Sequence, residues 1–227
     1  MSQKKPTALE EISLGWQKIL PEDVRSKTAR VQDCSNDLTE NEKRLTQDAS
    51  PRRLNEFVTA RRLARDLLDP SERNSLLERD QKSGAPVWPS GVVGSITHCK
   101  ELCSVAISEN GTLNSLGIDL EKIERVQFRF LSKIASEHEV KEMESYLSEN
   151  EFSTDVALAA IFSAKEAFYK FQYPLTGAWL GFRDVEVQIS DGKIHFAPKD
   201  ETITNETLGT PQAILHVTES HVLSVVY

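Results

Sequence analysis

Two carboxylates at the end of an apolar run are the first residues in this sequence whose types and spacing suggest chemistry. Asp119 and Glu121 flank Leu120 in the stretch GIDLEKIERV, residues 117–126. In a strand, residues two apart point to the same face, so the two acids would lie side by side. Like charges this close are unfavourable unless a cation lies between them or one acid takes up a proton. The pair therefore indicates either a hard-cation site, for example for Mg²⁺, or a surface turn whose acids are solvated.

A second group of charged residues lies in the clearest helix of the sequence, predicted over residues 154–171 with Thr154 as its N-cap and Pro174 just beyond its end. Lys165 and Glu166 are adjacent, and Glu166 and Lys170 are four residues apart, so the latter two share a face in the order that favours an ion pair. The run TDVALAAIFSAKEAFYKF is apolar nearly all round. A solvated ion pair is the simpler interpretation, but charges on such a helix would be partly desolvated, which favours a functional role.

A third group combines hydroxyls, a histidine and arginines, which suit a phosphate. The segment GSITH, residues 94–98, offers Thr97 and His98 as donors. In a helix predicted over residues 50–68, Arg53 and Arg61 are eight residues apart, about two turns, so they project in similar directions. Guanidinium groups bind phosphate through paired hydrogen bonds. The alternative interpretations are a structural histidine and an ordinary basic helix face.

The elements that would position these groups follow the same order twice. Residues 1–20 predict a short helix or tail. The helix at 50–68 is followed by two strands within residues 91–111, and the helix at 154–171 is followed by strand-like segments up to the C-terminus. The segments HCKELCSVAI and TESHVLSVVY are alike, each with a polar turn before an apolar strand. The sequence therefore predicts an α+β fold of two similar halves packed as a pseudo-dimer.

Composition limits the class of protein. The chain has 227 residues, of which 39% are hydrophobic and 27% charged, and its net charge is −8. Residues 1–110 hold 17 basic and 17 acidic side chains, so the acidic excess lies wholly after residue 110. This balance argues against nucleic-acid binding. No apolar run approaches the ~20 residues that span a membrane, and no signal peptide is evident, so a cytoplasmic protein is expected.

Three cysteines, an odd number in a long chain, argue against a disulfide framework. Cys99 and Cys103 lack a second pair of metal ligands nearby, so they are expected to be small buried residues rather than zinc ligands.

The three groups in this order, GSITH, GIDLE and FSAKEAFYKF, resemble the motifs of the 4′-phosphopantetheinyl transferases. The resemblance runs from about residue 50 to residue 187 and includes RR..EF...R in the first helix and P..G.WLGF.DVEV after the second. The chain as a whole is similar to the larger single-chain type, which activates enterobactin and surfactin synthetases. The resemblance implies a pseudo-dimer with the active site in the cleft between residues 1–112 and residues 113–227. It also implies a monomeric enzyme that transfers the phosphopantetheine arm of coenzyme A to a serine of an apo acyl or peptidyl carrier protein and releases 3′,5′-ADP.

The resemblance assigns roles to the residues of the three groups. Asp119, Glu121 and Glu166 would ligate Mg²⁺, with Glu166 also the candidate base for the serine proton. Lys170 would neutralise charge on the coenzyme A phosphates, and Lys165 would assist it. The residues expected to contact the adenosine 3′-phosphate are Arg53, Arg61, Thr97 and His98.

Three positions depart from the family pattern. Phe162 stands where Trp is frequent, and Ala60 where Gly is frequent. Ala85 stands where some relatives carry a phosphate-contacting lysine, so that contact is either absent or made by Lys82. Two other functions are compatible with parts of the pattern: a catalytically silent coenzyme A-binding protein of the same fold, and a Mg²⁺-dependent nuclease. The intact acids and Lys170 argue against the first, and the acidic second half argues against the second.

Overall fold

Two three-stranded antiparallel sheets lie at the centre of the protein, in a computed structural model that describes residues 5–32, 38, 40–70, 77–80, 82–109, 111–147 and 153–227. Their strand orders are β1-β3-β2 and β4-β8-β7, and a separate hairpin pairs β5 with β6. The strands are β1 (Val24–Arg30), β2 (Val93–Cys99), β3 (Leu102–Ser108), β4 (Gly117–Lys122), β5 (Val185–Ser190), β6 (Lys193–Pro198), β7 (Ala213–Val217) and β8 (His221–Val226).

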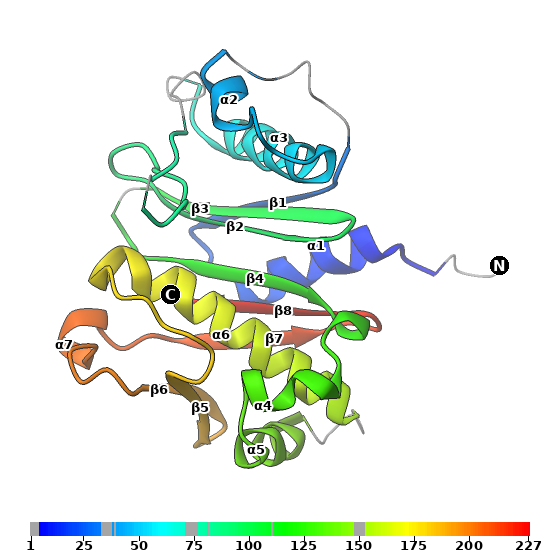
Figure 1. The fold of residues 1–227 in the computed structure, drawn as a ribbon, viewed down its shortest axis with the longest axis vertical. Coiled ribbons are helices and arrows are strands. Elements are labelled where there is room, and N and C mark those ends of the chain that lie inside the picture. Colours follow the sequence, from blue (N-terminus) through cyan, green and yellow to red (C-terminus); the bar gives the residue numbers. More distant parts are fainter. Residues whose placement is uncertain are drawn as a thin grey trace.

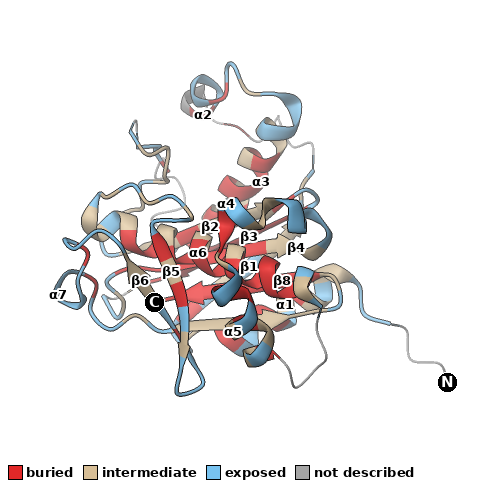
Figure 2. Cartoon of the chain, turned by 60° about the horizontal axis from the view of Figure 1, so that its bottom comes forward, coloured by how far each residue is buried: buried red, intermediate tan, exposed pale blue. Residues whose placement is uncertain are grey.

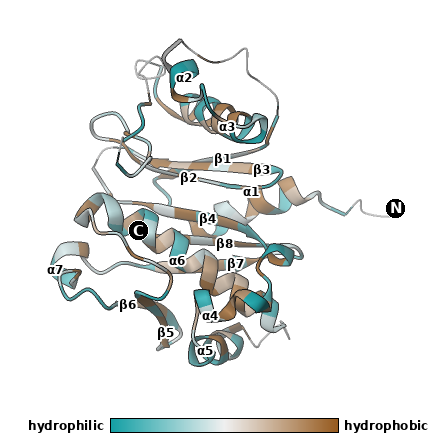
Figure 3. Cartoon of the chain, viewed as in Figure 1, coloured by the Kyte–Doolittle hydropathy of each residue, from teal (hydrophilic) through white to brown (hydrophobic). Residues whose placement is uncertain are grey.

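Helices cover these sheets in layers. Figure 1 shows α3 above the first sheet and α6 lying along the second, with α5 and the β5–β6 hairpin at the opposite end of the molecule from α3. The helices are α1 (Ala8–Ile19), α2 (Glu40–Leu45), α3 (Pro51–Leu67), α4 (Leu131–Ile134), α5 (Glu137–Leu147), α6 (Thr154–Thr176) and α7 (Asn205–Leu208). Burial is concentrated in the sheets, α3 and α6, whereas α2 is largely exposed and hydrophilic (Figures 2 and 3).

The two halves repeat one topology. Each consists of a strand, a helix and a final hairpin: β1, α3 and β2–β3 in the first half, then β4, α6 and β7–β8 in the second, where β5 and β6 are inserted. In both sheets the last strand pairs with the other two and so becomes the central one. Ser104 and Ser224, which belong to the two similar sequence segments, lie in these central strands. The predicted α+β pseudo-dimer is confirmed.

The alternation of β4 decides which of its side chains reach the second helix. Ile118 and Leu120 pack into an apolar cluster with Trp16 of α1, and Asp119, between them, bonds to Lys170 of α6. Gly117 allows the close approach of α6 on that same face, because a Cβ there would lie 1.9 Å from the carbonyl oxygen of Ala167. The apolar run before the acids therefore fills the core, while the acids face α6.

The two sheets meet at β2 and β4, which lie side by side although they belong to different sheets. Side chains make this junction: Ser95 Oγ accepts a hydrogen bond from the N–H of Ile118 and Thr97 Oγ1 accepts one from the N–H of Leu120, both at 3.0 Å. Helix α1 strengthens it from another side, since it contacts β1 of the first sheet and both β7 and β8 of the second. The halves are thus joined by two hydroxyls and one shared helix.

The structure confirms the predicted helix at 50–68 and corrects the limits of the other. Helix α3 begins after Ser50, whose hydroxyl accepts from the N–H of Arg53. Helix α6 has Ser153 rather than Thr154 at its N-cap and continues through Pro174 to Thr176. Proline removes only one N–H in the last turn, and the helix ends where Gly177 adopts a left-handed conformation, with φ of 67°.

Strand β1 and helix α5 are among the elements that are absent from the sequence prediction. Strand β1 is an edge strand in which Val24 alone is buried, so its sequence VRSKTAR lacks the apolar alternation that would mark it. Helix α5 was not predicted either. Its contacts with α6 and β5 position it in the tertiary structure.

Two expectations concerning the whole chain can be compared with the described residues. Cys99 and Cys103 are buried free thiols, as expected; Cys34 lies outside those residues. None of the helices in the described ranges combines the length and the apolar character that crossing a membrane requires.

Candidate active site

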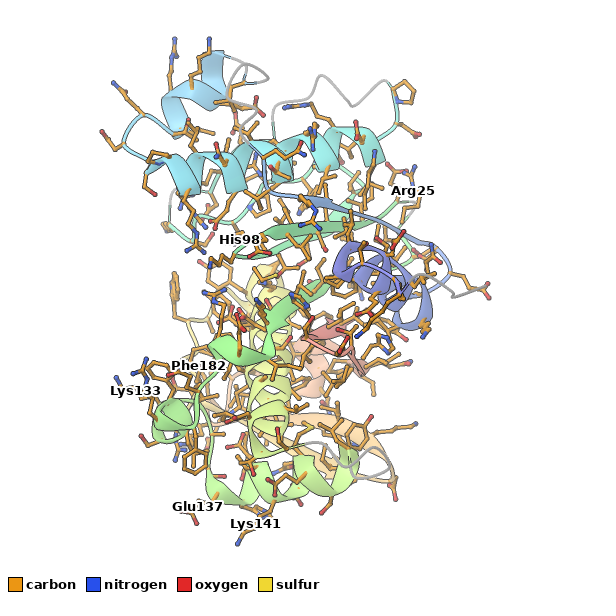
Figure 4. The ribbon with its side chains drawn as sticks, turned by 90° about the vertical axis from the view of Figure 1, so that its right-hand side faces the viewer. Arg25, His98, Lys133, Glu137, Lys141 and Phe182 are labelled. Atoms are coloured by element: carbon orange, nitrogen blue, oxygen red, sulfur yellow. The ribbon has the colours of Figure 1, made fainter. Side chains whose placement is uncertain are left out.

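A cleft of about 420 Å³ lies between α3 and α6, and both halves of the chain line it. Helix α3 and strand β2 contribute most of its basic side chains, together with the acid Glu56. Strand β4 and helix α6 contribute its other acids, together with Lys170. Figure 4 shows His98, at the end of β2, at the junction between the two halves. The predicted site residues that line the cleft are Arg53, Arg61, Thr97, His98, Asp119, Glu121, Glu166 and Lys170. Eight of the nine therefore come together, although they span more than a hundred positions of the sequence.

Asp119 is the most constrained acid of the cleft. Its Oδ1 accepts hydrogen bonds from Thr97 Oγ1 at 3.0 Å and from Lys170 Nζ at 2.7 Å. Lys170 Nζ also donates to the carbonyl of Ile118 at 3.0 Å. The other oxygen, Oδ2, is buried and has no hydrogen-bond partner among the described residues. A buried carboxylate oxygen without a donor is costly, so this atom suggests a missing ligand.

The neighbouring acids resist ionisation. Burial, with repulsion from Asp119, raises the pKa of Glu121 to about 7. Burial also raises the pKa of Glu166, with Asp119 again acting in the same direction and Lys170 opposing it. Arg125 offers only a long ion pair to Glu121, 3.8 Å between Nη1 and Oε2. Three acids that disfavour each other's charge form a site where a cation would be stabilised.

These acids do not form a preassembled metal cage. Among the residues that the structure describes, no group of three or more His, Cys, Asp or Glu side chains is close enough to hold an ion. The donor set nevertheless fits a hard cation, since all three groups supply carboxylate oxygens and Asp119 Oδ2 lacks a partner. Side-chain rotation of Glu121 or Glu166 would have to bring their oxygens toward Asp119.

The opposite wall combines cations with one carboxylate that sequence reasoning missed. Glu56 accepts from Arg52 Nε at 2.9 Å and from Arg53 Nη1 at 3.4 Å, and its Oε2 lies 3.6 Å from His98 Nδ1. Arg53 Nη1 also lies 2.8 Å from His98 Nε2. Arginine can only donate, so Nε2 accepts and the imidazole is neutral. Burial lowers the pKa of His98, and Arg53 adds to this effect while Glu56 opposes it.

Glu56 thus holds Arg53 and His98 in fixed orientations at the rim of the cleft. The sequence contained a signal for this role, because Glu56 follows Arg52 and Arg53 by four and three positions on one helix.

Arg61 is the deepest cation of the cleft. It is almost fully buried, its guanidinium lies 4.5 Å from the centre of the Phe57 ring, and its Nε has no hydrogen-bond partner among the described residues. Burial lowers its pKa to about 10, with Arg65 and Arg79 adding to the shift and Glu42 opposing it. Arg79, which also lines the cleft, was not predicted and has no sequence motif that marks it. A buried guanidinium whose Nε lacks a partner among the described residues, with Arg79 nearby, suits an anionic ligand.

Lys165 does not lie in this cleft. Its ammonium is buried and donates at 2.8 Å to the carbonyls of Ile134 and Phe182, and it pairs with Glu139 Oε1 at 2.6 Å. Consecutive residues of a helix point in different directions, so Glu166 faces the cleft while Lys165 faces α4 and α5. The expectation that Lys165 assists at the phosphates is not supported by this placement.

The departures from the family pattern have clear positions. Phe162 lines the cleft and stacks on Phe182, with ring centres 4.8 Å apart. Lys82, the candidate substitute for the lysine missing at Ala85, is not among the residues that line the cleft, whereas Arg79 is. Thr97 lines it, but its hydroxyl is committed to Leu120 and Asp119.

Comparison with known families covers both halves of the chain. Residues 41–108 match the model of the 4′-phosphopantetheinyl transferase N-terminal domain, and residues 115–226 match that of the 4′-phosphopantetheinyl transferase superfamily. The chain belongs to the 4′-phosphopantetheinyl transferase superfamily of enzymes, in its larger single-chain form.

Named relatives agree with this assignment. The chain is 33% identical over 181 residues to the 4′-phosphopantetheinyl transferase Npt of Nocardia iowensis, and the aligned region covers 77% of each protein. It is 35% identical over 141 residues to PptT of Mycobacterium tuberculosis, which covers 60% of this chain and 58% of PptT. Among solved structures, the holo-[acyl-carrier-protein] synthase of Thermotoga maritima has a TM-score of 0.38 and 26% identity, over 49% of this chain and 60% of that one.

Proposed function

We propose that this protein transfers the 4′-phosphopantetheine arm of coenzyme A to a serine of an apo acyl or peptidyl carrier protein, in a Mg²⁺-dependent reaction that releases 3′,5′-ADP. The observation that carries the proposal is the cleft between the halves, which places a cationic wall opposite an acidic one. Membership of the superfamily supports the same reaction.

The cationic wall suits the adenosine 3′-phosphate of coenzyme A. Arg53, Arg61 and His98 come from α3 and β2 and line one side of the cleft. Planar guanidinium groups bind phosphate with good geometry, and the neutral imidazole of His98 can donate through one nitrogen. The N-terminal half, residues 1–112, is thus proposed as the side that holds the 3′-phosphate.

The acidic wall suits a divalent cation and the pyrophosphate. Asp119, Glu121 and Glu166 would hold Mg²⁺, since their oxygens are the ligand type that this ion takes and one of them is unpartnered. Bound there, Mg²⁺ would offset negative charge on the phosphates as the bond to the leaving 3′,5′-ADP breaks. The C-terminal half, residues 113–227, supplies this wall and the helix that carries Glu166 and Lys170.

Two residues of α6 would act directly on the reacting groups. Lys170 lines the cleft beside Asp119 and can stabilise charge that develops on phosphate oxygens. Glu166 has a raised pKa, which brings a carboxylate closer to the range in which it works as a general base for the serine proton. Because one chain supplies both walls, we propose a monomer as the active form.

The test is a transfer assay on several apo carrier proteins. The protein is incubated with coenzyme A and Mg²⁺, and each carrier is weighed by mass spectrometry for the gain of one phosphopantetheine. Transfer is expected with wild type and not with Glu166→Ala or in the presence of a chelator. A protein that binds coenzyme A but modifies none of the carriers would instead be the catalytically silent binder.

A further inference from the structure

The hydroxyl of Thr97 is used entirely within the protein. A threonine hydroxyl has one proton to donate and lone pairs to accept with. Thr97 Oγ1 donates to Asp119 Oδ1 and accepts from the N–H of Leu120, both at 3.0 Å, and the side chain is only 3% exposed. Its single proton therefore points at a carboxylate of β4, and a phosphate in the cleft would have to compete for it.

This contact makes the two oxygens of Asp119 unequal. Oδ1 receives Thr97 from one side and Lys170 from the other, at 3.0 and 2.7 Å. Oδ2 receives no hydrogen bond from the described residues. Two donors on one oxygen lock the carboxylate in one rotation and leave the second oxygen for a ligand.

We propose that Thr97 is a positioning residue for the metal: it holds Asp119 from the other half of the molecule so that Oδ2 is the oxygen presented to the divalent cation. The inference rests on the proposed function, since it presumes that Asp119 is a metal ligand. From strand β2 this hydroxyl reaches both the backbone of β4 and the carboxylate.

Ser95 provides a matched control within the same junction. Its hydroxyl accepts from the N–H of Ile118 at 3.0 Å, two residues earlier on both strands, and the side chain is buried to the same degree as that of Thr97. The hydrogen bonds that the structure gives to Ser95 do not include Asp119. Loss of either hydroxyl therefore weakens the junction, but only the loss at Thr97 removes a hydrogen-bond donor from Asp119.

The experiment measures binding of Mn²⁺, as a probe for the cation, by the disappearance of the free-ion signal in electron paramagnetic resonance with coenzyme A present. Wild type is compared with Thr97→Val, Thr97→Ser, Ser95→Ala and Asp119→Asn, and thermal unfolding of each is recorded. We expect Thr97→Val to weaken Mn²⁺ binding about tenfold or more, as loss of a group that orients a metal ligand does. Thr97→Ser restores the hydroxyl and should bind within about threefold of wild type, as should Ser95→Ala.

The outcomes separate this inference from the proposed function. Equal Mn²⁺ affinity in Thr97→Val and Ser95→Ala, with wild type binding well and Asp119→Asn binding poorly, would overturn the role of Thr97 and leave the metal site intact. Failure of wild type to bind Mn²⁺, or full binding by Asp119→Asn, would overturn the metal site itself. Should the valine variant not fold, Thr97→Ala removes the hydroxyl without placing a methyl group against the N–H of Leu120, and the same comparison applies.

Discussion

Asp119 interacts electrostatically with the other ionisable groups of β4 and α6 in the cleft. It pairs with Lys170, and its charge helps to raise the pKa of both Glu121 and Glu166. One of its oxygens accepts two hydrogen bonds, one from Thr97 of the first half and one from Lys170 of the second. The electrostatics of the cleft therefore depend in part on one carboxylate that accepts hydrogen bonds from both halves.

Glu121→Gln should flatten the pH dependence of stability in the metal-free protein. Burial raises the pKa of Glu121 from 4.5 to about 7 in the folded state. Between these values the folded protein binds more protons than the unfolded chain, so its stability falls as the pH rises. Between about pH 5 and pH 7.5 this one group removes about 2 kcal/mol from the free energy of unfolding.

Urea unfolding of wild type and Glu121→Gln at both pH values, with a chelator present, measures this difference. The exposed neighbour Glu124 offers a control, because its substitution by Gln should keep the pH dependence of wild type. If Glu121→Gln and wild type lose stability in parallel as the pH rises, Glu121 is not the group that titrates in this range.

Arg53→Gln should weaken coenzyme A binding about tenfold, because one charged hydrogen bond to a phosphate contributes roughly 1.5 kcal/mol. Arg52→Gln is its control, since Arg52 pairs with the same Glu56 but does not line the cleft. Calorimetric titration of both variants with coenzyme A and with 3′-dephospho-coenzyme A measures the affinity that each variant loses for each ligand. The Arg53 variant should lose affinity only for the first ligand; an equal loss for both would place Arg53 away from the 3′-phosphate.

At the scale of elements, adjacent residues of one motif in α6 have two different roles: some line the cleft and one anchors the helix to its neighbours. Glu166 and Lys170 face the cleft, whereas Lys165 ties the helix to α4, to α5 and to the loop before β5. Glu139, its partner, also accepts from the N–H of Val187 at 3.0 Å and from that of Ser136 at 2.7 Å. The position of α6 over β4 is thus set by a buried ion pair on the side opposite the reacting groups.

Lys165→Met should destabilise the protein by about 3–5 kcal/mol, because it leaves Glu139 buried without its cation. The double substitution Lys165→Met with Glu139→Leu should recover part of this loss, since no buried charge is left uncompensated, although the N–H groups of Val187 and Ser136 lose their acceptor. Urea unfolding measures both effects. A double variant that folds well but binds coenzyme A much more weakly than wild type would show that Lys165 contributes to coenzyme A binding.

At the scale of the whole molecule, helix α1 holds the two halves in one arrangement. Trp16 is fully buried, packs with residues of both sheets, and its indole N–H donates to Ser104 Oγ of β3 at 3.0 Å. The cleft has one wall on each half, so its width depends on this packing as well as on the junction of β2 with β4.

Trp16→Ala should cost about 3–5 kcal/mol of stability, as large aromatic side chains do when they are removed from a core. Leu14→Ala, on the exposed face of the same helix, should change stability by less than about 0.5 kcal/mol. Denaturant unfolding followed by circular dichroism measures both. A loss below about 1 kcal/mol for Trp16→Ala would mean that α1 is not needed to join the halves.

Much of this arrangement could be predicted from the sequence because it depends on local order. The apolar residues marked α3 and α6, a polar turn marked the final hairpin, and the spacing of Asp119 and Glu121 placed both acids on one face of a strand. The three motifs in sequence also indicated the family and eight of the residues that line the cleft.

What the sequence by itself determined was therefore most of the charged residues that line the cleft and the main elements that carry them. Only the tertiary structure decided how each side chain is used: that Lys165 joins a buried ion pair, that Glu56 contacts both Arg53 and His98, and that the proton of Thr97 goes to Asp119. The physical reason is that hydrogen-bond donors, acceptors and charges find their partners across the packed halves, between residues far apart in the chain. Periodicity and propensity describe each element alone and contain no information about those partners.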